Sequence, residues 1–200
     1  MKKPSILDLR PTQFVLGVRE IESKTTRMKK FTKPELMDYC NDHKIPVVIG
    51  PKQELYMIDH HHFARACWEQ EVDLYTLKLV KDLSHKNEKA FWNFMIRERW
   101  VYLNDQFGMG PHSPSALPSD IRCLADDPYR SLVWEVLNEG SIRKQNIPFF
   151  EFEWAQFFRL NLDVHLHSKS NFRTAIKLAA KLARSSEAKG IPGYRGRAGK

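Results

Sequence analysis

The chain has 200 residues, 42% of them hydrophobic, and carries 32 Lys and Arg against 24 Asp and Glu, a formal net charge of +8. This length suits one compact domain, or one domain with a helical addition. The basic balance permits nucleic acid, nucleotides or acidic proteins as partners. Three scattered cysteines without C-x-x-C spacing argue against a disulfide framework, and no apolar stretch approaches the ~20 residues of a membrane span. We therefore expect a cytoplasmic protein without a membrane partner.

The first eighty residues combine strand and helix patterns, which predicts a mixed α/β fold. Short alternating or β-branched runs bounded by Gly and Pro indicate strands, and a Thr-Lys-Pro-Glu capping box indicates the start of a helix. In chain order we expect an edge strand over 6–10, a helix from Thr32 to about Cys40, a hairpin of strands over 45–49 and 55–58, a helix over about 61–70 and a strand over 72–80.

Helical spacing dominates after Asp82. Asp127-Pro128 is typical of a helix start, and residues 107–114 are too rich in Gly and Pro for regular structure. We expect helices over 86–99, from Asp127 to about Glu139, over 148–160 and over 171–189.

The expected organisation has three parts. A small mixed α/β core takes residues 1–82, and a helical extension packed on it takes residues 83–190. The rings between Phe149 and Phe158 are predicted to form the core between these two halves. A basic flexible tail over 191–200 contains Arg195, Arg197 and Lys200.

The segment Asp59-His60-His61-His62 carries the most information about function, because it joins an expected strand to an expected helix. A helix N-terminus favours an anion through its unpaired N–H groups and the positive end of its dipole. Asp59 is a candidate cap or general base, His61 a candidate acid/base group, and His60 and His62 candidate phosphate ligands. Successive helical side chains diverge by about 100°, so at least one histidine faces the core. The same divergence argues against a dedicated zinc site.

Other charged residues add candidates for the same chemistry. Glu20, Glu22 and Lys24 form an acid–acid–base pattern after the first strand, where a carboxylate could remove a proton and Lys24 could contact a phosphate. A solvated loop is the alternative for this segment. Arg130 lies near the start of an expected helix, where it would either grip a phosphate or form an ion pair that braces the helical half.

Two segments of the first half resemble motifs of the ParB/sulfiredoxin-like domain. Residues 6–13 are similar to L-x-x-L-R-P-T-Q, and residues 58–63 are similar to I-D-G-H-x-R, with His60 in place of the glycine. The Asp-His-His-His form, together with D-D-P-Y-R at 126–130 and E-F-E-W-A-Q-F-F-R at 151–159, resembles the divergent branch of ParB-like nucleases. The resemblance covers roughly residues 6–194.

The resemblance implies a nucleotide phosphate held at the strand-to-helix junction, with Mg²⁺ carried by an ATP-, ADP- or CTP-type nucleotide and contacted by Glu20 or Asp59. It implies hydrolysis or transfer of a phosphoryl group, as a nuclease, an NTPase or a small-molecule kinase. Glu20 would act as base, and Lys24 and Arg65 would offset developing charge. The expected partner is a nucleotide or a phosphorylated small molecule, with nucleic acid as a further candidate.

Two other functions stay open on the sequence. The first is a nucleotide-gated, DNA-associated binding protein without turnover of its own. The second is a degenerate fold that serves contacts between proteins. The sequence predicts no oligomeric state.

Overall fold

The structure is a computed structural model that describes residues 3–164, 166 and 168–196. It divides into two compact units. Unit 1 consists of Met1–Leu16 and Glu20–Asp126, and unit 2 of Gly17–Arg19 and Asp127–Lys200. The division lies after Asp126 and not after Asp82, because residues 83–126 pack on the sheet of unit 1.

Unit 1 is built on a four-stranded mixed sheet with the order β1-β4-β3-β5. Its strands are β1 (Leu9–Pro11), β4 (Leu55–Met57), β3 (Ile45–Ile49) and β5 (Leu77–Asp82). The expected hairpin is confirmed, since β3 and β4 pair antiparallel with Val48 opposite Tyr56. The pairs β1–β4 and β3–β5 are parallel. A second, two-stranded parallel sheet joins β2 (Val15–Leu16) to β6 (Ala125–Asp126).

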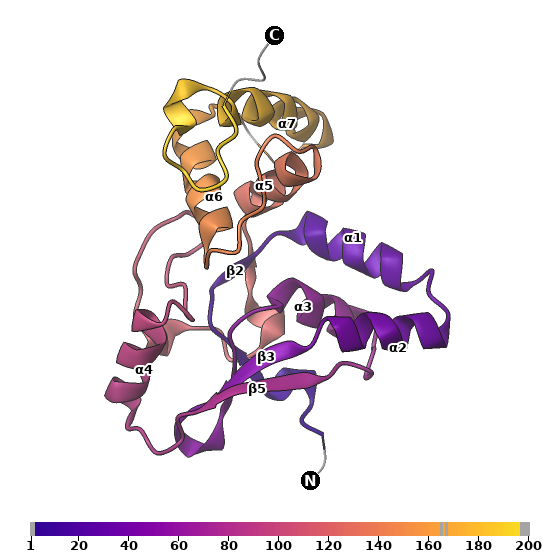
Figure 1. Ribbon diagram of the computed structural model, residues 1–200, viewed down its shortest axis with the longest axis vertical. Coiled ribbons are helices and arrows are strands. Elements are labelled where there is room, and N and C mark those ends of the chain that lie inside the picture. The colour runs from indigo at the N-terminus through magenta and orange to yellow at the C-terminus, as the bar shows by residue number, and fades with distance from the viewer. Residues whose placement is uncertain (1–2, 165, 167, 197–200) are drawn as a thin grey trace. The chain divides into compact units, whose positions relative to one another are not determined.

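Side chains alternate between the two faces of the main sheet along each strand, and helices cover both faces. Val47 and Met57 belong to one hydrophobic cluster, together with buried side chains of helices α1 (Val18–Met28), α2 (Lys33–Asp42) and α3 (His61–Glu69). Val48 and Tyr56 belong to another, together with Phe91 and Met95 of α4 (Glu88–Arg97). Within unit 1, α1, α2 and α3 therefore cover one face of the sheet and α4 the other (Figure 1).

Several predicted elements of unit 1 are confirmed. Helix α2 begins at the expected capping box, in which the Thr32 N–H donates to Glu35 Oε2 at 2.7 Å. Helices α3 and α4 lie within the expected ranges, and the loop over 107–114 contains no strand or α-helix.

Two expectations for unit 1 are wrong, and one helix is not predicted. Residues 6–8 form a turn of 3-10 helix and not a strand, because Ser5 and Asp8 cap that turn reciprocally. The strand expected over 72–80 begins only at Leu77, after Glu71 adopts a positive φ of 52° and the Tyr75 hydroxyl turns to donate to the Pro4 carbonyl. The helix that is not predicted is α1, which begins at Val18.

Unit 2 consists mainly of three helices, α5 (Pro128–Asn138), α6 (Phe150–Asn161) and α7 (Lys169–Ala183). Asp127 caps α5 as expected, accepting from the Tyr129 N–H at 2.9 Å. Rings of α6, including Trp154 and Phe158, belong to a cluster made of unit 2 residues. Helix α7 ends earlier than expected, at Ala183, and a 3-10 turn over Ser186–Ala188 follows.

The expected basic tail is described only in part. The Trp154 indole donates to the Pro192 carbonyl at 2.7 Å, and Arg195 Nη1 donates to the Gly140 carbonyl at 2.7 Å. Arg197 and Lys200 lie outside the described residues. No helix in the described part of the chain is long and apolar enough to cross a membrane.

Candidate functional site

The junction between β4 and α3 adopts a conformation that is unusual for a histidine. His60 occupies the N-cap position with φ 63° and ψ 26°, in the left-handed region, and its side chain does not cap the helix. Asp59 was a candidate cap; it precedes the N-cap, and its Oδ1 accepts from the His60 N–H at 2.6 Å. His60 thus adopts the backbone conformation that favours glycine, at the position where the superfamily motif has glycine.

His61 faces the interior of unit 1. It is 4% exposed, and its Nε2 accepts a hydrogen bond from the Thr12 N–H at 3.3 Å. Burial lowers the pKa of His61 to about 3 against the opposing charge of Asp59, and the charges of His62 and His60 contribute less in the lowering direction. The imidazole is therefore neutral at physiological pH and acts as a hydrogen-bond acceptor. This is the inward-facing histidine that the helical spacing requires. The acid/base role expected of His61 stays a prediction, and in this structure its Nε2 is occupied by the bond from Thr12.

His62 faces an acidic side chain of helix α1. Its Nδ1 lies 3.4 Å from Glu20 Oε2, while Glu20 Oε1 lies 3.3 Å from Lys24 Nζ. Glu20 and Lys24 share a face of α1 because they are four residues apart. All three side chains are largely buried, with exposures between 12% and 24%. The structure therefore brings together an imidazole, a carboxylate and an ammonium group at the first turn of α3.

Two further histidines border this group. His43, at the end of α2, was missed by the sequence analysis. Its ring lies 4.2 Å from that of Tyr39 and 5.6 Å from that of Phe63, and its carbonyl is 3.3 Å from His60 Nδ1. Burial lowers the pKa of His43, and the charges of Lys24 and His60 lower it further. No local sequence pattern marks His43 as part of the site, because it reaches the junction only through the packing of α2 against α3.

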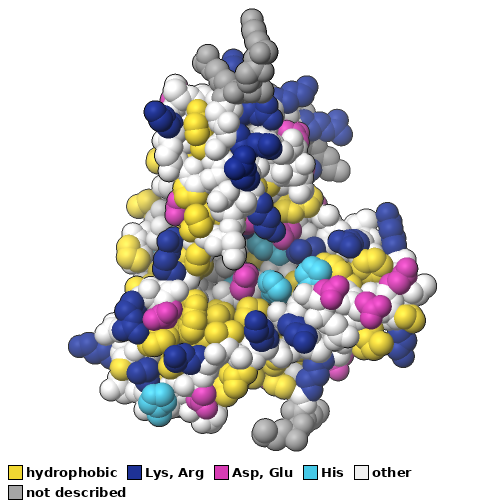
Figure 2. Space-filling view, in the orientation of Figure 1, with side chains coloured by type: hydrophobic (Ala, Val, Ile, Leu, Met, Phe, Trp, Pro, Cys, Tyr) yellow, Lys and Arg dark blue, Asp and Glu magenta, His cyan; other side chains and the backbone are white. Residues whose placement is uncertain are grey.

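We refer to Glu20, Lys24, His43, His60 and His62 as the junction cluster. Its two permanent charges, those of Glu20 and Lys24, are opposite and in contact. Its three imidazoles can accept and return a proton. Figure 2 shows histidine side chains beside acidic and basic ones on the displayed face of the molecule. The arrangement can orient an imidazole with a carboxylate, as general acid–base sites do, and can place one ammonium group near an anion.

Arg65 does not belong to the junction cluster. Its Nε donates to Glu69 Oε1 at 2.8 Å, and its Nη1 donates to the carbonyls of Ile121 and Arg122 at 3.2 and 3.3 Å. These bonds tie α3 to the 3-10 turn Ile121–Cys123. In this structure Arg65, which was predicted to contact a phosphate, instead holds α3 against this turn.

Arg130 lies in unit 2 and forms an ion pair with Glu151, which was one of the two alternatives for this residue. Its guanidinium also lies 4.6 Å from the centre of the Phe152 ring. Arg130 is 4% exposed, and its Nε and Nη1 atoms have no hydrogen-bond partner among the described residues. In the same unit, Asp127 Oδ2 accepts from Arg159 at 2.7 Å, and burial raises the pKa of that carboxyl against the opposing effect of Arg159.

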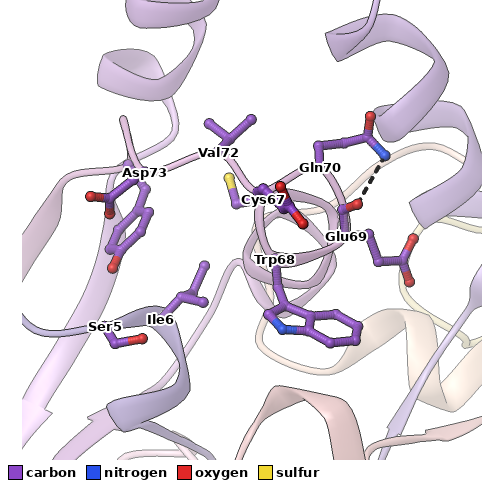
Figure 3. A pocket seen from close by; sticks show the side chains of 10 residues that line it. Ser5, Ile6, Cys67, Trp68, Glu69, Gln70, Val72 and Asp73 are labelled. Atoms are coloured by element: carbon purple, nitrogen blue, oxygen red, sulfur yellow. Dashed lines mark hydrogen bonds between the residues drawn. The ribbon is translucent and has the colours of Figure 1, made fainter.

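A cavity of about 710 Å³ lies in unit 1 at the opposite end of α3 from the junction cluster. Cys67, Trp68 and Val72 give it apolar walls, and Gln70 donates to the Glu69 carbonyl at its edge (Figure 3). Acidic side chains line the same cavity, namely Glu69, Glu71 and Asp73. Three carboxylates repel a polyanion, so the junction cluster suits a phosphate better than this cavity does.

The described residues contain no group of three or more His, Cys, Asp or Glu side chains that could hold a metal ion. Glu20 contacts both Lys24 and His62, and Asp59 is an exposed carboxylate whose Oδ1 accepts from the His60 N–H. These two side chains do not form a set of ligands for Mg²⁺, which prefers several oxygen atoms in octahedral geometry.

The mixed sheet, followed by a strand-to-helix junction that carries the Asp-His-His-His sequence, defines a ParB-like α/β protein. The chain belongs to the family described as "Putative ParB-like nuclease", which matches residues 3–160. A crystal structure of protein Atu1540 from Agrobacterium tumefaciens is similar, with a TM-score of 0.87 and 36% sequence identity. That similarity covers 98% of this chain and 97% of the other. No curated protein matches the chain.

Proposed function

We propose that the protein hydrolyses a phosphodiester at the junction cluster. The observation that carries this proposal is the contact of 3.4 Å between Glu20 Oε2 and His62 Nδ1 beside Lys24. A carboxylate on one ring nitrogen fixes the orientation of an imidazole and stabilises its protonated form, so that proton transfer takes place at the other nitrogen. The family description, which names a nuclease, supports the same class of reaction.

In the proposed reaction His62 Nε2 accepts a proton from water as the water oxygen attacks phosphorus. The bond from phosphorus to the leaving oxygen breaks, and that oxygen takes a proton from solvent or from the protonated imidazole. Lys24 and the positive end of the α3 dipole stabilise the negative charge on the non-bridging oxygens. Glu20 is a positioning residue because it acts through His62.

The charges of the cluster favour a phosphodiester over a nucleoside triphosphate. A diester phosphate carries one negative charge, which matches the single ammonium group of Lys24. A triphosphate carries several, and it would meet the carboxylate of Glu20 and the nearby exposed carboxylate of Asp59 without a second lysine or arginine in the cluster. Nucleotide binding with accompanying Mg²⁺ stays the second candidate, as the resemblance to the wider superfamily implies.

The decisive experiment is cleavage of fluorescent single- and double-stranded DNA and RNA, in Mg²⁺, in Mn²⁺ and in EDTA. His62→Asn should lower the rate about 10²–10⁴-fold, the usual contribution of a general base. Glu20→Gln should lower kcat by less and leave KM nearly unchanged. His85→Asn removes an exposed histidine outside the cluster and is the matched control.

Two results would contradict the proposal. One is a His62→Asn variant that cleaves at the wild-type rate. The other is an absence of cleavage combined with a melting shift in ATP, ADP, CTP or GTP. A nucleotide at 100 times its Kd adds about 2.7 kcal/mol to the free energy of unfolding, so a thermal-shift screen detects that outcome.

A further inference from the structure

Helix α7 of unit 2 presents a row of basic side chains on its exposed face. Arg173, Lys177 and Lys181 are exposed and follow one another at intervals of four residues. Residues four apart lie on the same side of a helix, so the three side chains form one stripe. We call these three residues the α7 stripe. Residues 169–183 contain no Asp or Glu, and none of the three basic residues forms an ion pair within the described parts of the chain.

The opposite face of α7 is part of the core of unit 2. Phe172, Ala175, Ala179 and Ala183 are between 0% and 5% exposed and belong to the hydrophobic cluster of that unit. A basic amphipathic helix of this kind often binds membranes by burying its apolar face among lipids. Here that face is already covered by protein, so only the charged face is available to a partner. This favours a hydrophilic polyanion over a lipid surface.

The dimensions of the stripe fit a polynucleotide. Four residues of α-helix rise about 6 Å, so the stripe is about 12 Å long. One strand of a duplex carries a phosphate about every 3.4 Å along its axis, and a surface of this length faces three or four of them. Three flexible cationic side chains on one line contact phosphates without reading bases, which gives binding that is independent of sequence. Figure 2 shows Lys and Arg side chains over the part of unit 2 in which α7 lies.

We propose that the α7 stripe binds the sugar-phosphate backbone of nucleic acid. The stripe lies beyond residues 3–160, the part of the chain that matches the family. The inference rests on the proposed function in one respect, because it names a polynucleotide as the phosphodiester that the junction cluster would cleave. The binding itself depends only on α7.

The test measures binding of a 20-base-pair fluorescent duplex by anisotropy between 50 and 200 mM salt, in EDTA. The variant Arg173→Gln/Lys177→Gln/Lys181→Gln removes the stripe. The control Lys29→Gln/Lys30→Gln/Lys33→Gln removes the same charge from exposed positions of unit 1. Each neutralised phosphate contributes about 0.9 to the slope of log K against log salt, so loss of the stripe should reduce the slope by about 2 to 3. The control should reduce it by less than 1.

Thermal melting verifies that both triple variants remain folded. Equal loss of affinity in the two variants would overturn the proposal, because it would show a general effect of net charge. Binding to vesicles with anionic lipid but not to the duplex would overturn it in favour of a membrane. Two further measurements separate the proposals. His62→Asn should bind the duplex with the wild-type affinity, because His62 lies outside the α7 stripe. A wild-type chain that binds DNA but never cleaves it would refute hydrolysis and leave the stripe intact.

Discussion

The backbone N–H of Thr12 donates to the buried Nε2 of His61, and this bond joins the residue after β1 to the first turn of α3. The same threonine holds β4, since its Oγ1 donates to the Met57 carbonyl at 2.8 Å. Thr12 is 1% exposed. Thr12 thus links α3 to β4, and its bond to His61 forms only while that imidazole is neutral.

Unit 1 should therefore lose stability in acid through His61. The pKa of this imidazole is about 3 in the folded protein and ordinarily 6.5, so the unfolded chain binds more protons between these values. The stabilising contribution is complete above pH 6.5 and is lost as the pH falls toward 3, by at most about 1.4 kcal/mol per pH unit. Denaturant unfolding at several pH values should show this slope. His61→Gln should flatten it and His85→Asn should not; an unchanged slope in His61→Gln would show that other groups cause the loss.

The left-handed conformation of His60 predicts an unusual order of stabilities. A residue with a Cβ atom pays about 1–2 kcal/mol in this region, and glycine does not. Both His60→Gly and His60→Ala remove the ring from its contacts with His43 and Phe63, but only the alanine keeps the backbone strain. The glycine variant should therefore be more stable than the alanine variant by about 1 kcal/mol in urea unfolding. An alanine variant of equal or higher stability would mean that the turn relaxes.

Replacing one or the other partner of the Arg130–Glu151 ion pair in unit 2 should lower the free energy of unfolding by different amounts. Glu151→Ala leaves the buried guanidinium of Arg130 without its carboxylate, and two of its nitrogens already lack partners among the described residues. We expect a loss of about 3 kcal/mol, against a smaller loss for Arg130→Met, which buries no charge. The double variant should be more stable than Glu151→Ala alone. If the two single variants lose the same free energy, burial of the unpaired cation is not the cause.

The three cysteines should differ in reactivity by location. Cys40 and Cys67 are fully buried and burial raises the pKa of both thiols, whereas Cys123 is exposed. Because the thiolate is the reactive form, a maleimide should label Cys123 rapidly, and it should label Cys40 and Cys67 only on unfolding. Mass spectrometry of the labelled chain measures this. Cys123→Ser should abolish the rapid phase, and a rapid phase that persists in this variant would contradict the burial of the other two.

Local sequence patterns predicted most helices and strands of unit 1. The residues at which the strands begin and end depend on tertiary contacts. The capping box at Thr32 and the apolar run before Asp59 are local signals, and the structure confirms the elements they indicated. Helix α1 was missed although its buried residues Ile21, Thr25 and Met28 follow helical spacing, so the signal was present. The late start of β5 could not be foreseen, because it depends on a contact between Tyr75 and the distant Pro4.

The candidate site was predictable as a region but not in its details. The helical spacing required one histidine to face inward, yet only the position of Thr12 shows that it is His61. The contact of Glu20 with His62 joins residues far apart in the chain, and it follows from the packing of α1 beside α3. The charges of Arg65 and Arg130 made them candidate phosphate contacts. In the folded chain these two arginines pair with Glu69 and Glu151 instead.

The turn at residue 60 also restricts which substitutions relatives can carry while keeping the junction. Glycine adopts a positive φ at no cost, and Asn, Asp and His tolerate it better than other residues do. We therefore expect an alignment of the family to show this small set at the position of His60, and Val, Ile or Thr only together with a change in the length of the turn. The backbone conformation at residue 60 thus limits which residue types can stand there, whatever the substrate. His60 can satisfy this limit without taking any part in catalysis.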